Sequence, residues 1–421
     1  MSSPFDEVVI LNDYASLTGG SSAVAIASAI GLAARGLRVT YFACVGPVAP
    51  VLRAVPNLEV HCLDQPEIAR DPKRGRAFFT GLRNARAVAA LRGVLAGKDP
   101  SRTLVHVHTW MKALSPYALD EVEAQGFPLV VTLHDFFIAC PTGGFYEHHT
   151  GRLCQRTPLS GSCLRCNCDR RSYPQKLWRS FRTYLQNERL RVPRRAAHYI
   201  GVSNFSVDLL RPYLPDDVPV TVVRNPAECP DEGPVDVRRN EAMVFVGRLV
   251  PEKGVRLFAY AARRTGLPAV FIGDGELREE LHSLCPEARF TGWLSPEGIR
   301  AELRRARALV FPPLWYETLG LVAIEAAAAG VPAIVSDRCA ATDYVWHGEN
   351  GLHFSHGSVE ALAIAMRELA NDAPRAATLG RAAYDWYWNN PWTVDRHVDE
   401  LLAVYRSLAA DPTPETNEVL A

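Results

Sequence analysis

The 421-residue sequence lacks an apolar run long enough to cross a lipid bilayer, since a spanning helix needs about 20 apolar residues. Its most apolar stretch is interrupted by Glu325. The first residues, MSSPFDEVV, also lack the basic segment and apolar core of a secretory signal. From these absences we expect a cytoplasmic protein, and we leave open peripheral attachment at the inner face of the membrane.

The sequence also lacks net charge, with 46 Lys and Arg against 46 Asp and Glu. This balance hides an asymmetry, because residues 1–227 contain 27 Lys and Arg but only 18 Asp and Glu. A basic front half indicates an anionic partner, such as anionic lipid headgroups or a phosphate-bearing acceptor. The alternative is a charge bias that only helps the two halves face one another. We do not expect a nucleic-acid partner.

A GxGxxG dinucleotide fingerprint and a solenoid repeat are absent as well. The chain opens with a predicted strand at Val8–Leu11, a glycine turn, and a predicted helix at Ala23–Ala34. The pattern restarts in the second half, with a strand at Ala242–Val246 and a helix at Val255–Thr265. Repeated strand–helix units of this kind favour parallel sheets. We therefore predict an α/β protein with two Rossmann-like, doubly wound domains that face one another across a cleft.

The domain boundaries follow from changes in composition. We place the first domain at residues 1–227 and the second at 228–392, because a segment rich in Pro, Asp and Glu separates them. A helix at 393–409 is expected to return to the first domain, and residues 410–421 to form a disordered tail. Within the first domain, residues 140–182 break the alternation of strands and helices, and we treat them as an insertion.

The stretch Phe311–Asp337 combines several features of a ligand site. Glu317 lies in a loop before a predicted helix that ends at Ala329 and is apolar apart from Glu325. A charge in such a helix is costly unless it is paired. The start of the helix offers unpaired backbone N–H groups and the positive end of the helix dipole. The combination predicts a ligand that carries both phosphates and hydroxyls.

Two other segments are expected at the same cleft. Arg248 and Lys253 follow the strand that ends at Val246, above the carboxyl edge of the second sheet. A planar guanidinium and a compact ammonium together suit a diphosphate. In the first domain, His134 follows the predicted strand Val130–Leu133 and would reach the facing edge.

Five motifs occur in order and together span most of residues 242–355: GRLVPEKG, GDGE, FTGWL, PPLWYETLGLVAIEAAAAGVPAIVSD and WHGENGL. Together they closely resemble the motifs of retaining glycosyltransferases of family 4, which have the GT-B fold. The segments GGSS and VSNF and the strand-end histidine extend the similarity more loosely to the first domain.

The resemblance implies a retaining hexosyltransferase that uses a UDP- or GDP-sugar and a saccharide or lipid-linked acceptor, in polysaccharide or glycolipid biosynthesis. The leaving diphosphate can take the acceptor's proton. No cofactor is required for this chemistry, because Arg248 and Lys253 would stabilise the developing charge in place of a divalent metal. The alternatives are a GT-B nucleotide-sugar epimerase and a non-catalytic nucleotide-sugar-binding protein.

The same resemblance implies a role for each site residue. Arg248 and Lys253 would bind the donor pyrophosphate, and His134 and Glu317 would contact the transferred sugar; these four form the expected catalytic set. Glu325 would accept hydrogen bonds from the ribose. The other expected donor-binding residues belong to glycine turns and to the helix start: Gly19, Gly20, Gly273, Asp274, Gly292, Trp293, Leu294, Thr318, Leu319 and Gly320.

Half of the ten cysteines fall within residues 140–168. Four of them have a spacing compatible with a tetrahedral zinc site: Cys140, Cys154, Cys163 and Cys166. Cys168 could replace any one of these four ligands. We predict structural zinc here, and we leave open an iron–sulfur centre, free thiols and disulfides. The neighbourhood is basic and aromatic, including Trp178 and Arg179. It is suited to a membrane surface or a lipid diphosphate acceptor, or it is a solvated face.

Overall fold

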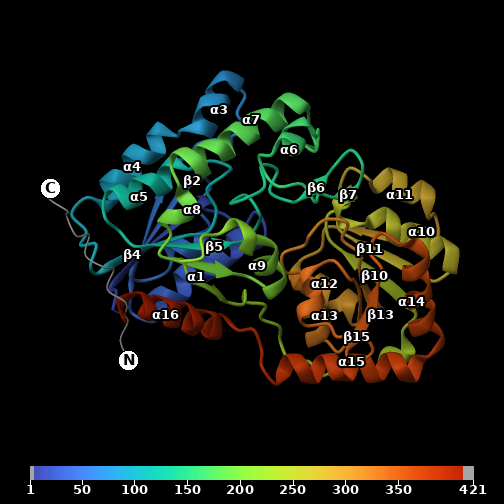
Figure 1. The fold of residues 1–421 in the computed structure, drawn as a ribbon. Coiled ribbons are helices and arrows are strands. Elements are labelled where there is room, and N and C mark those ends of the chain that lie inside the picture. Colours follow the sequence, from blue (N-terminus) through green and yellow to red (C-terminus); the bar gives the residue numbers. More distant parts are fainter. Residues whose placement is uncertain (1–3, 411–421) are drawn as a thin grey trace.

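The structure is a computed structural model that describes residues 4–410. It contains two separate parallel sheets, one in each half of the molecule (Figure 1). The first sheet has seven strands in the order β3-β2-β1-β4-β5-β8-β9. In chain order these strands are β1 (Glu7–Tyr14), β2 (Arg38–Val45), β3 (Leu58–Cys62), β4 (Thr103–Val107), β5 (Leu129–Leu133), β8 (His198–Gly201) and β9 (Val220–Val222).

The second sheet has six strands in the order β12-β11-β10-β13-β14-β15. They are β10 (Ala242–Val246), β11 (Ala269–Ile272), β12 (Arg289–Gly292), β13 (Ala306–Phe311), β14 (Ala333–Ser336) and β15 (Gly351–Phe354). Two parallel sheets with helices on their faces confirm the predicted α/β class with two doubly wound domains.

Helices cover both faces of the first sheet because alternate residues of its strands point to opposite sides. Val8 and Ile10 of β1 belong to one apolar core, and Val9 and Leu11 belong to another. The helices of this half are α1 (Gly20–Ala34), α2 (Pro50–Arg53), α3 (Arg74–Leu82), α4 (Ala85–Leu95), α5 (Tyr117–Ala124), α6 (Gly161–Arg165), α7 (Tyr173–Tyr184), α8 (Val192–Arg195) and α9 (Asn204–Leu210).

The second half is built around one continuous apolar core. Its helices are α10 (Val255–Thr265), α11 (Arg278–Leu284), α12 (Pro296–Leu303), α13 (Leu321–Ala328), α14 (Val359–Asn371) and α15 (Ala373–Trp388). The predictions for β10 and α10 are confirmed residue for residue. Within residues 4–410, no helix has the length and apolar character needed to cross a membrane.

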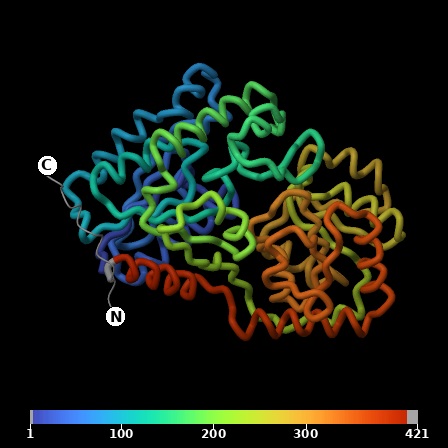
Figure 2. Tube along the Cα trace, viewed as in Figure 1, coloured from blue at the N-terminus to red at the C-terminus, as the bar shows by residue number. Residues whose placement is uncertain are grey.

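The last helix, α16 (Val394–Ala410), lies against the first sheet's half rather than beside α15 (Figures 1 and 2). It packs on α1 so closely that a Cβ built at Gly31 would lie 2.3 Å from Val398 Cγ2. The helix includes Ala410, which we expected in the tail. The rest of the expected tail, 411–421, lies outside the described residues.

The segment 140–182 is more ordered than its irregular composition indicates. It forms a small antiparallel pair, β6 (Tyr146–Glu147) and β7 (Arg152–Leu153), followed by α6 and the first part of α7. Helix α7 begins at Tyr173, because the Ser172 side chain accepts a hydrogen bond from Gln175 N and caps the helix. After Tyr184 it continues as a π-helical turn, Leu185–Arg189.

Candidate active site

A cavity of about 620 Å³ lies between the two domains and is lined by both. The first domain contributes the turn before α1, and the second contributes the start of α13. A Cβ built at Gly20, the first residue of α1, would lie 4.0 Å from Leu321, the first residue of α13. Two helix N-termini therefore face each other across the cavity. Each offers unpaired N–H groups and the positive end of a dipole, so the space favours an anion.

The loop after β10 brings a cation to this space. Gly254 has φ +70°, and a Cβ there would lie 1.8 Å from Pro312 O, so only glycine allows the loop to pack this closely. The packing places Lys253 Nζ 2.6 Å from Glu317 Oε2. Trp315 Nε1 donates to the same oxygen at 2.8 Å, and its ring lies beneath the Lys253 ammonium. Arg248, from the same loop, is exposed and lines the cavity.

The segment before α13 is held from both domains. Thr318 Oγ1 donates to His134 O at 3.1 Å, and Ser203 Oγ donates to Thr318 O at 2.7 Å. Gly320 has φ +86°, and a Cβ there would lie 2.8 Å from the Phe311 ring. The predicted phosphate-binding amides of Thr318, Leu319 and Gly320 therefore lie at the cavity in a fixed backbone conformation.

His134 lines the first-domain side of the cavity. Its Nε2 lies 2.9 Å from Nδ1 of His108, and burial lowers the pKa of His134 to about 3. The imidazole is therefore neutral near pH 7. A neutral imidazole exchanges hydrogen bonds with a sugar hydroxyl but does not serve as a cationic acid.

Asp135 is a cavity residue that the sequence analysis did not select. Burial raises its pKa to about 6, and Phe137 N donates to its Oδ1 at 3.0 Å. Lys112 lines the same part of the cavity. The available signal was its position directly after His134 at the end of β5, where ligands of parallel sheets bind.

Six expected donor-binding residues lie outside the lining of this cavity: Gly273, Asp274, Gly292, Trp293, Leu294 and Glu325. The turn at Gly273 nevertheless touches the cationic loop, because Leu249 N donates to Asp274 O at 2.9 Å. Glu325 lies on α13, where burial raises its pKa to about 7. The roles of these six residues in binding a nucleotide stay predictions.

The five clustered cysteines are free thiols in the structure. In the part of the chain that is described, no group of three or more His, Cys, Asp or Glu residues is placed to hold a metal ion. Lys176 Nζ lies 3.3 Å from Cys163 Sγ, so a cation already faces one of the four predicted ligands. The described side chains therefore do not form a zinc site as they stand, and the zinc site stays a prediction from the sequence.

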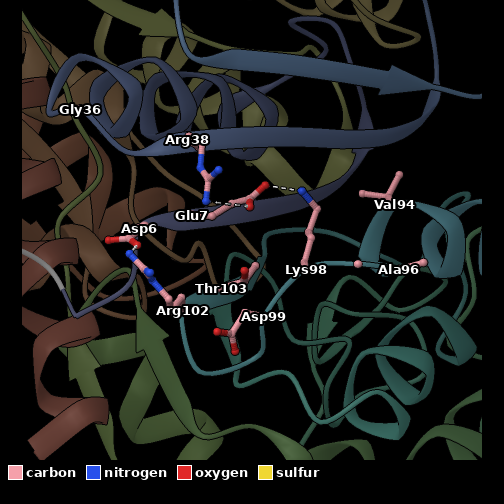
Figure 3. Close-up of a pocket in the computed structure, with 11 residues that line it drawn as sticks. Asp6, Glu7, Gly36, Arg38, Val94, Ala96, Lys98, Asp99, Arg102 and Thr103 are labelled. Atoms are coloured by element: carbon pink, nitrogen blue, oxygen red, sulfur yellow. Dashed lines mark hydrogen bonds and ion pairs between the residues drawn. The ribbon is translucent and has the colours of Figure 1, made fainter.

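A larger hollow of about 920 Å³ lies at the amino ends of β1 and β4 (Figure 3). Its charges pair with one another: Lys98 with Glu7, and Arg102 with Asp6. Ligands of open parallel sheets bind at the opposite, carboxyl ends of the strands. We therefore assign the site to the cavity between the domains.

Two family models match the chain. Glycosyltransferase Family 4 matches residues 18–229, and Glycosyl transferases group 1 matches residues 236–386. The chain belongs to glycosyltransferase family 4. Its resemblance to this family, first seen in the motifs of the second half, thus extends over the first half as well.

Curated relatives of this glycosyltransferase align over less than half of their own length. Glycogen synthase of Mycobacterium tuberculosis is 34% identical over 195 residues, which cover 40% of this chain and 45% of the relative. The GDP-mannose-dependent alpha-(1-6)-phosphatidylinositol monomannoside mannosyltransferase of the same organism is 32% identical over 161 residues, which cover 34% of this chain and 42% of the relative.

Two solved structures align over nearly the whole chain. Sucrose-phosphate synthase from Thermosynechococcus elongatus has a TM-score of 0.73 at 20% identity, covering 96% of this chain and 99% of that one. Anabaena HepE in complex with UDP and glucose has a TM-score of 0.66 at 17% identity, covering 95% and 99%. These likenesses establish the fold, and the GT-B expectation is confirmed.

Proposed function

We propose that this protein is a retaining glycosyltransferase that moves a hexose from a UDP- or GDP-sugar to an acceptor hydroxyl, in polysaccharide or glycolipid biosynthesis. The observation that carries the proposal is the convergence of two helix N-termini with Arg248 and Lys253 at one cavity between the domains. Such a site suits a diphosphate flanked by a sugar. Two related proteins support a nucleotide-sugar donor: a GDP-mannose-dependent enzyme and a protein in complex with UDP and glucose.

The reaction assigns separate tasks to the two sides of the cleft. The bond between the anomeric carbon and the diphosphate oxygen breaks, and the acceptor oxygen bonds to the same face of that carbon. The acceptor's proton passes to the leaving diphosphate. Arg248 and Lys253 stabilise the negative charge that develops there, while Glu317 and neutral His134 orient the sugar through its hydroxyls.

The proposal is tested by a donor screen with the purified full chain. Thermal-shift measurements with UDP- and GDP-sugars first identify the donor, because a ligand that binds only the folded state raises the melting temperature. Release of nucleoside diphosphate and transfer of radiolabelled sugar to lipid or saccharide acceptors are then measured. Transfer with retained anomeric configuration is expected. Epimerised donor without released diphosphate, or binding without any turnover, would contradict the proposal.

A further inference from the structure

Helix α7 is inverted relative to an ordinary surface helix, because it exposes apolar side chains and buries polar ones. Its buried side chains are Lys176, Ser180, Arg182 and Thr183. Its exposed stripe has helical spacing and side chains that are 37–48% exposed: Tyr173, Leu177, Phe181 and Tyr184. Residues four and three positions apart share one helix face, so these four form a continuous apolar strip.

The orientation of α7 is fixed by the hydrogen bonds of its polar side. Lys176 Nζ lies 3.3 Å from Cys163 O and 3.0 Å from Ser180 Oγ. Arg182 Nη1 donates to Met111 O at 2.7 Å. Rotating the helix to bury its aromatic side chains would break these bonds and take the Arg182 donor away from the buried carbonyl of Met111, which is costly. The exposure of the apolar strip is therefore built into the fold.

Two neighbouring helices extend the strip. Phe78 and Phe79 of α3 are exposed, and the Phe78 ring lies 6.1 Å from the Trp178 ring of α7. Leu164 of α6 is exposed as well, and its carbonyl accepts a hydrogen bond from Tyr173 Oη at 2.8 Å. The three helices lie together at the upper edge of the first domain (Figure 1).

We call these seven side chains the aromatic face: Phe78, Phe79, Leu164, Tyr173, Leu177, Phe181 and Tyr184. They are seven of the thirteen exposed large hydrophobic residues in the described part of the chain. Scattered exposed hydrophobics need no explanation, but a contiguous patch of this kind marks a binding surface.

The charge around the aromatic face identifies its partner. Helices α3, α6 and α7 contain no Asp or Glu. Four exposed basic side chains lie in these helices or just before them: Lys73, Arg74, Arg165 and Arg171. A second copy of this chain that docked through the same face would bring like charges together, whereas an anionic lipid surface neutralises them. Aromatic residues combined with Lys and Arg are typical of segments that lie in a membrane interface.

We propose that the aromatic face docks this protein on an anionic lipid bilayer, with its apolar side chains in the interface and the surrounding cations against the headgroups. Membrane docking is a property beyond the proposed function. It rests on the proposed function in one respect only, namely that a lipid-linked acceptor would reach the cleft from this membrane. The polar side of α7 contacts the segments that line the cavity. Gln186, which follows the helix, donates from Nε2 to Phe137 O at 3.1 Å, and Arg182 bonds Met111 beside Lys112. Docking would therefore place the first-domain side of the cleft next to the membrane.

Vesicle flotation of the full chain tests the proposal, with vesicles of phosphatidylcholine alone or mixed with phosphatidylglycerol. We expect the protein to float only with the mixed vesicles, and less so at high salt because salt screens the headgroup attraction. The double variant Leu177→Glu/Phe181→Glu should lower the bound fraction by about tenfold or more. Ile364→Glu, at an exposed apolar position on α14 outside the aromatic face, is the matched control and should bind like the wild type.

A second variant, Arg74→Glu/Arg165→Glu, tests the charges alone and should also weaken flotation. Melting temperatures of all variants show whether they are folded. Wild type that does not float, or a folded Leu177→Glu/Phe181→Glu variant that floats equally well, would overturn the proposal. The proposal would also be overturned if the wild type formed a dimer and did not bind vesicles, and if the Leu177→Glu/Phe181→Glu variant were a monomer. The aromatic face would then serve self-association. Flotation requires no sugar donor. It can therefore show membrane binding when the transferase assay fails, and the transferase assay can succeed when the protein does not float.

Discussion

The two sides of the cleft use different chemistry although both are built from a strand, a loop and a helix start. The second-domain side carries charge: Arg248, and the ammonium of Lys253 paired with Glu317. Besides Lys112, the first-domain side carries His134, which is neutral because its pKa is lowered, and Asp135, whose pKa is raised towards neutrality. Under the proposed function, this difference would divide the labour, with the leaving diphosphate held by one domain and the sugar and acceptor by the other.

The two sides also differ in the space around their glycines. Gly254 cannot take a side chain without meeting Pro312 O, whereas a Cβ at Gly20 would make only an ordinary contact at 4.0 Å with Leu321. The second-domain loop is thus fixed by close packing within its own domain. The first-domain turn has room, as expected for a surface that a ligand approaches.

The largest expected effect is the loss of charge on the second-domain side. Lys253→Ala should lower kcat/KM by a factor of about 10²–10³, or about 3–4 kcal/mol, because a preorganised cation at a developing charge is removed. Steady-state kinetics with the identified donor measures this. Arg256→Ala is the control, because Arg256 pairs with Glu280 away from the cavity. Full activity of Lys253→Ala would show that the cation is not needed for the reaction.

A second test addresses the rigid loop. Gly254→Ala should lower the free energy of unfolding by about 3 kcal/mol, because it combines a left-handed backbone with an overlap of two atoms. Gly266→Ala has a similar φ of +68° with no atom within 4 Å, and it should cost only about 1 kcal/mol. Urea unfolding compares the two variants. Equal losses would mean that the contact with Pro312 is unimportant.

A third test uses pH to examine the first-domain side. The pKa of Asp135 is raised to about 6 by burial, so the folded state holds this proton more tightly than the unfolded state. Ionisation of Asp135 therefore reduces stability as pH rises from about 4 through 6. Asp135→Asn should raise the free energy of unfolding by about 3 kcal/mol at about pH 8, and by nothing below about pH 4. Asparagine keeps the acceptor for Phe137 N. A stability gain that does not depend on pH would contradict this cause.

The smallest effect on activity is expected from an ion pair that joins the two domains outside the cavity. Arg170, from the cysteine-containing segment, places Nη2 2.5 Å from Glu276 Oε2 of the second domain. Both side chains are nearly half exposed, and such pairs contribute about 0.5 kcal/mol. Arg170→Ala should change the donor KM by about twofold at most. A much larger change in donor titrations would mean that this segment controls closure of the cleft.

The sequence predicts an element well where local signals mark both of its ends. Helix α10 lies between Gly254 and Gly266, which both have left-handed backbones, and its prediction is confirmed residue for residue. Helix α3 has no comparable signal at its start, because its first residues, Arg74, Gly75 and Arg76, resemble a basic loop. Its close fit depends instead on the Trp178 ring, which leaves no room for a side chain at Gly81. That contact is distant in sequence.

The candidate site divides in the same way. Lys253, Glu317 and Gly320 were predicted from ordered motifs, and the structure brings them to one cavity. Asp135 was not selected, because its raised pKa arises from burial between segments that the sequence does not place together. Trp315 was not selected either, although its indole N–H fixes the Glu317 carboxylate.

Helix α16 has a consequence for the order in which the chain folds during synthesis. Val398, Leu401 and Tyr405 complete a core that also contains Phe5 and Val8, and Tyr405 Oη lies 2.7 Å from His106 Nδ1 in β4. Domains fold as units as they leave the ribosome. The apolar core of the first domain therefore stays incomplete until the second domain and α16 have been translated. A chain released before α16 would expose that incomplete core to chaperones and proteases.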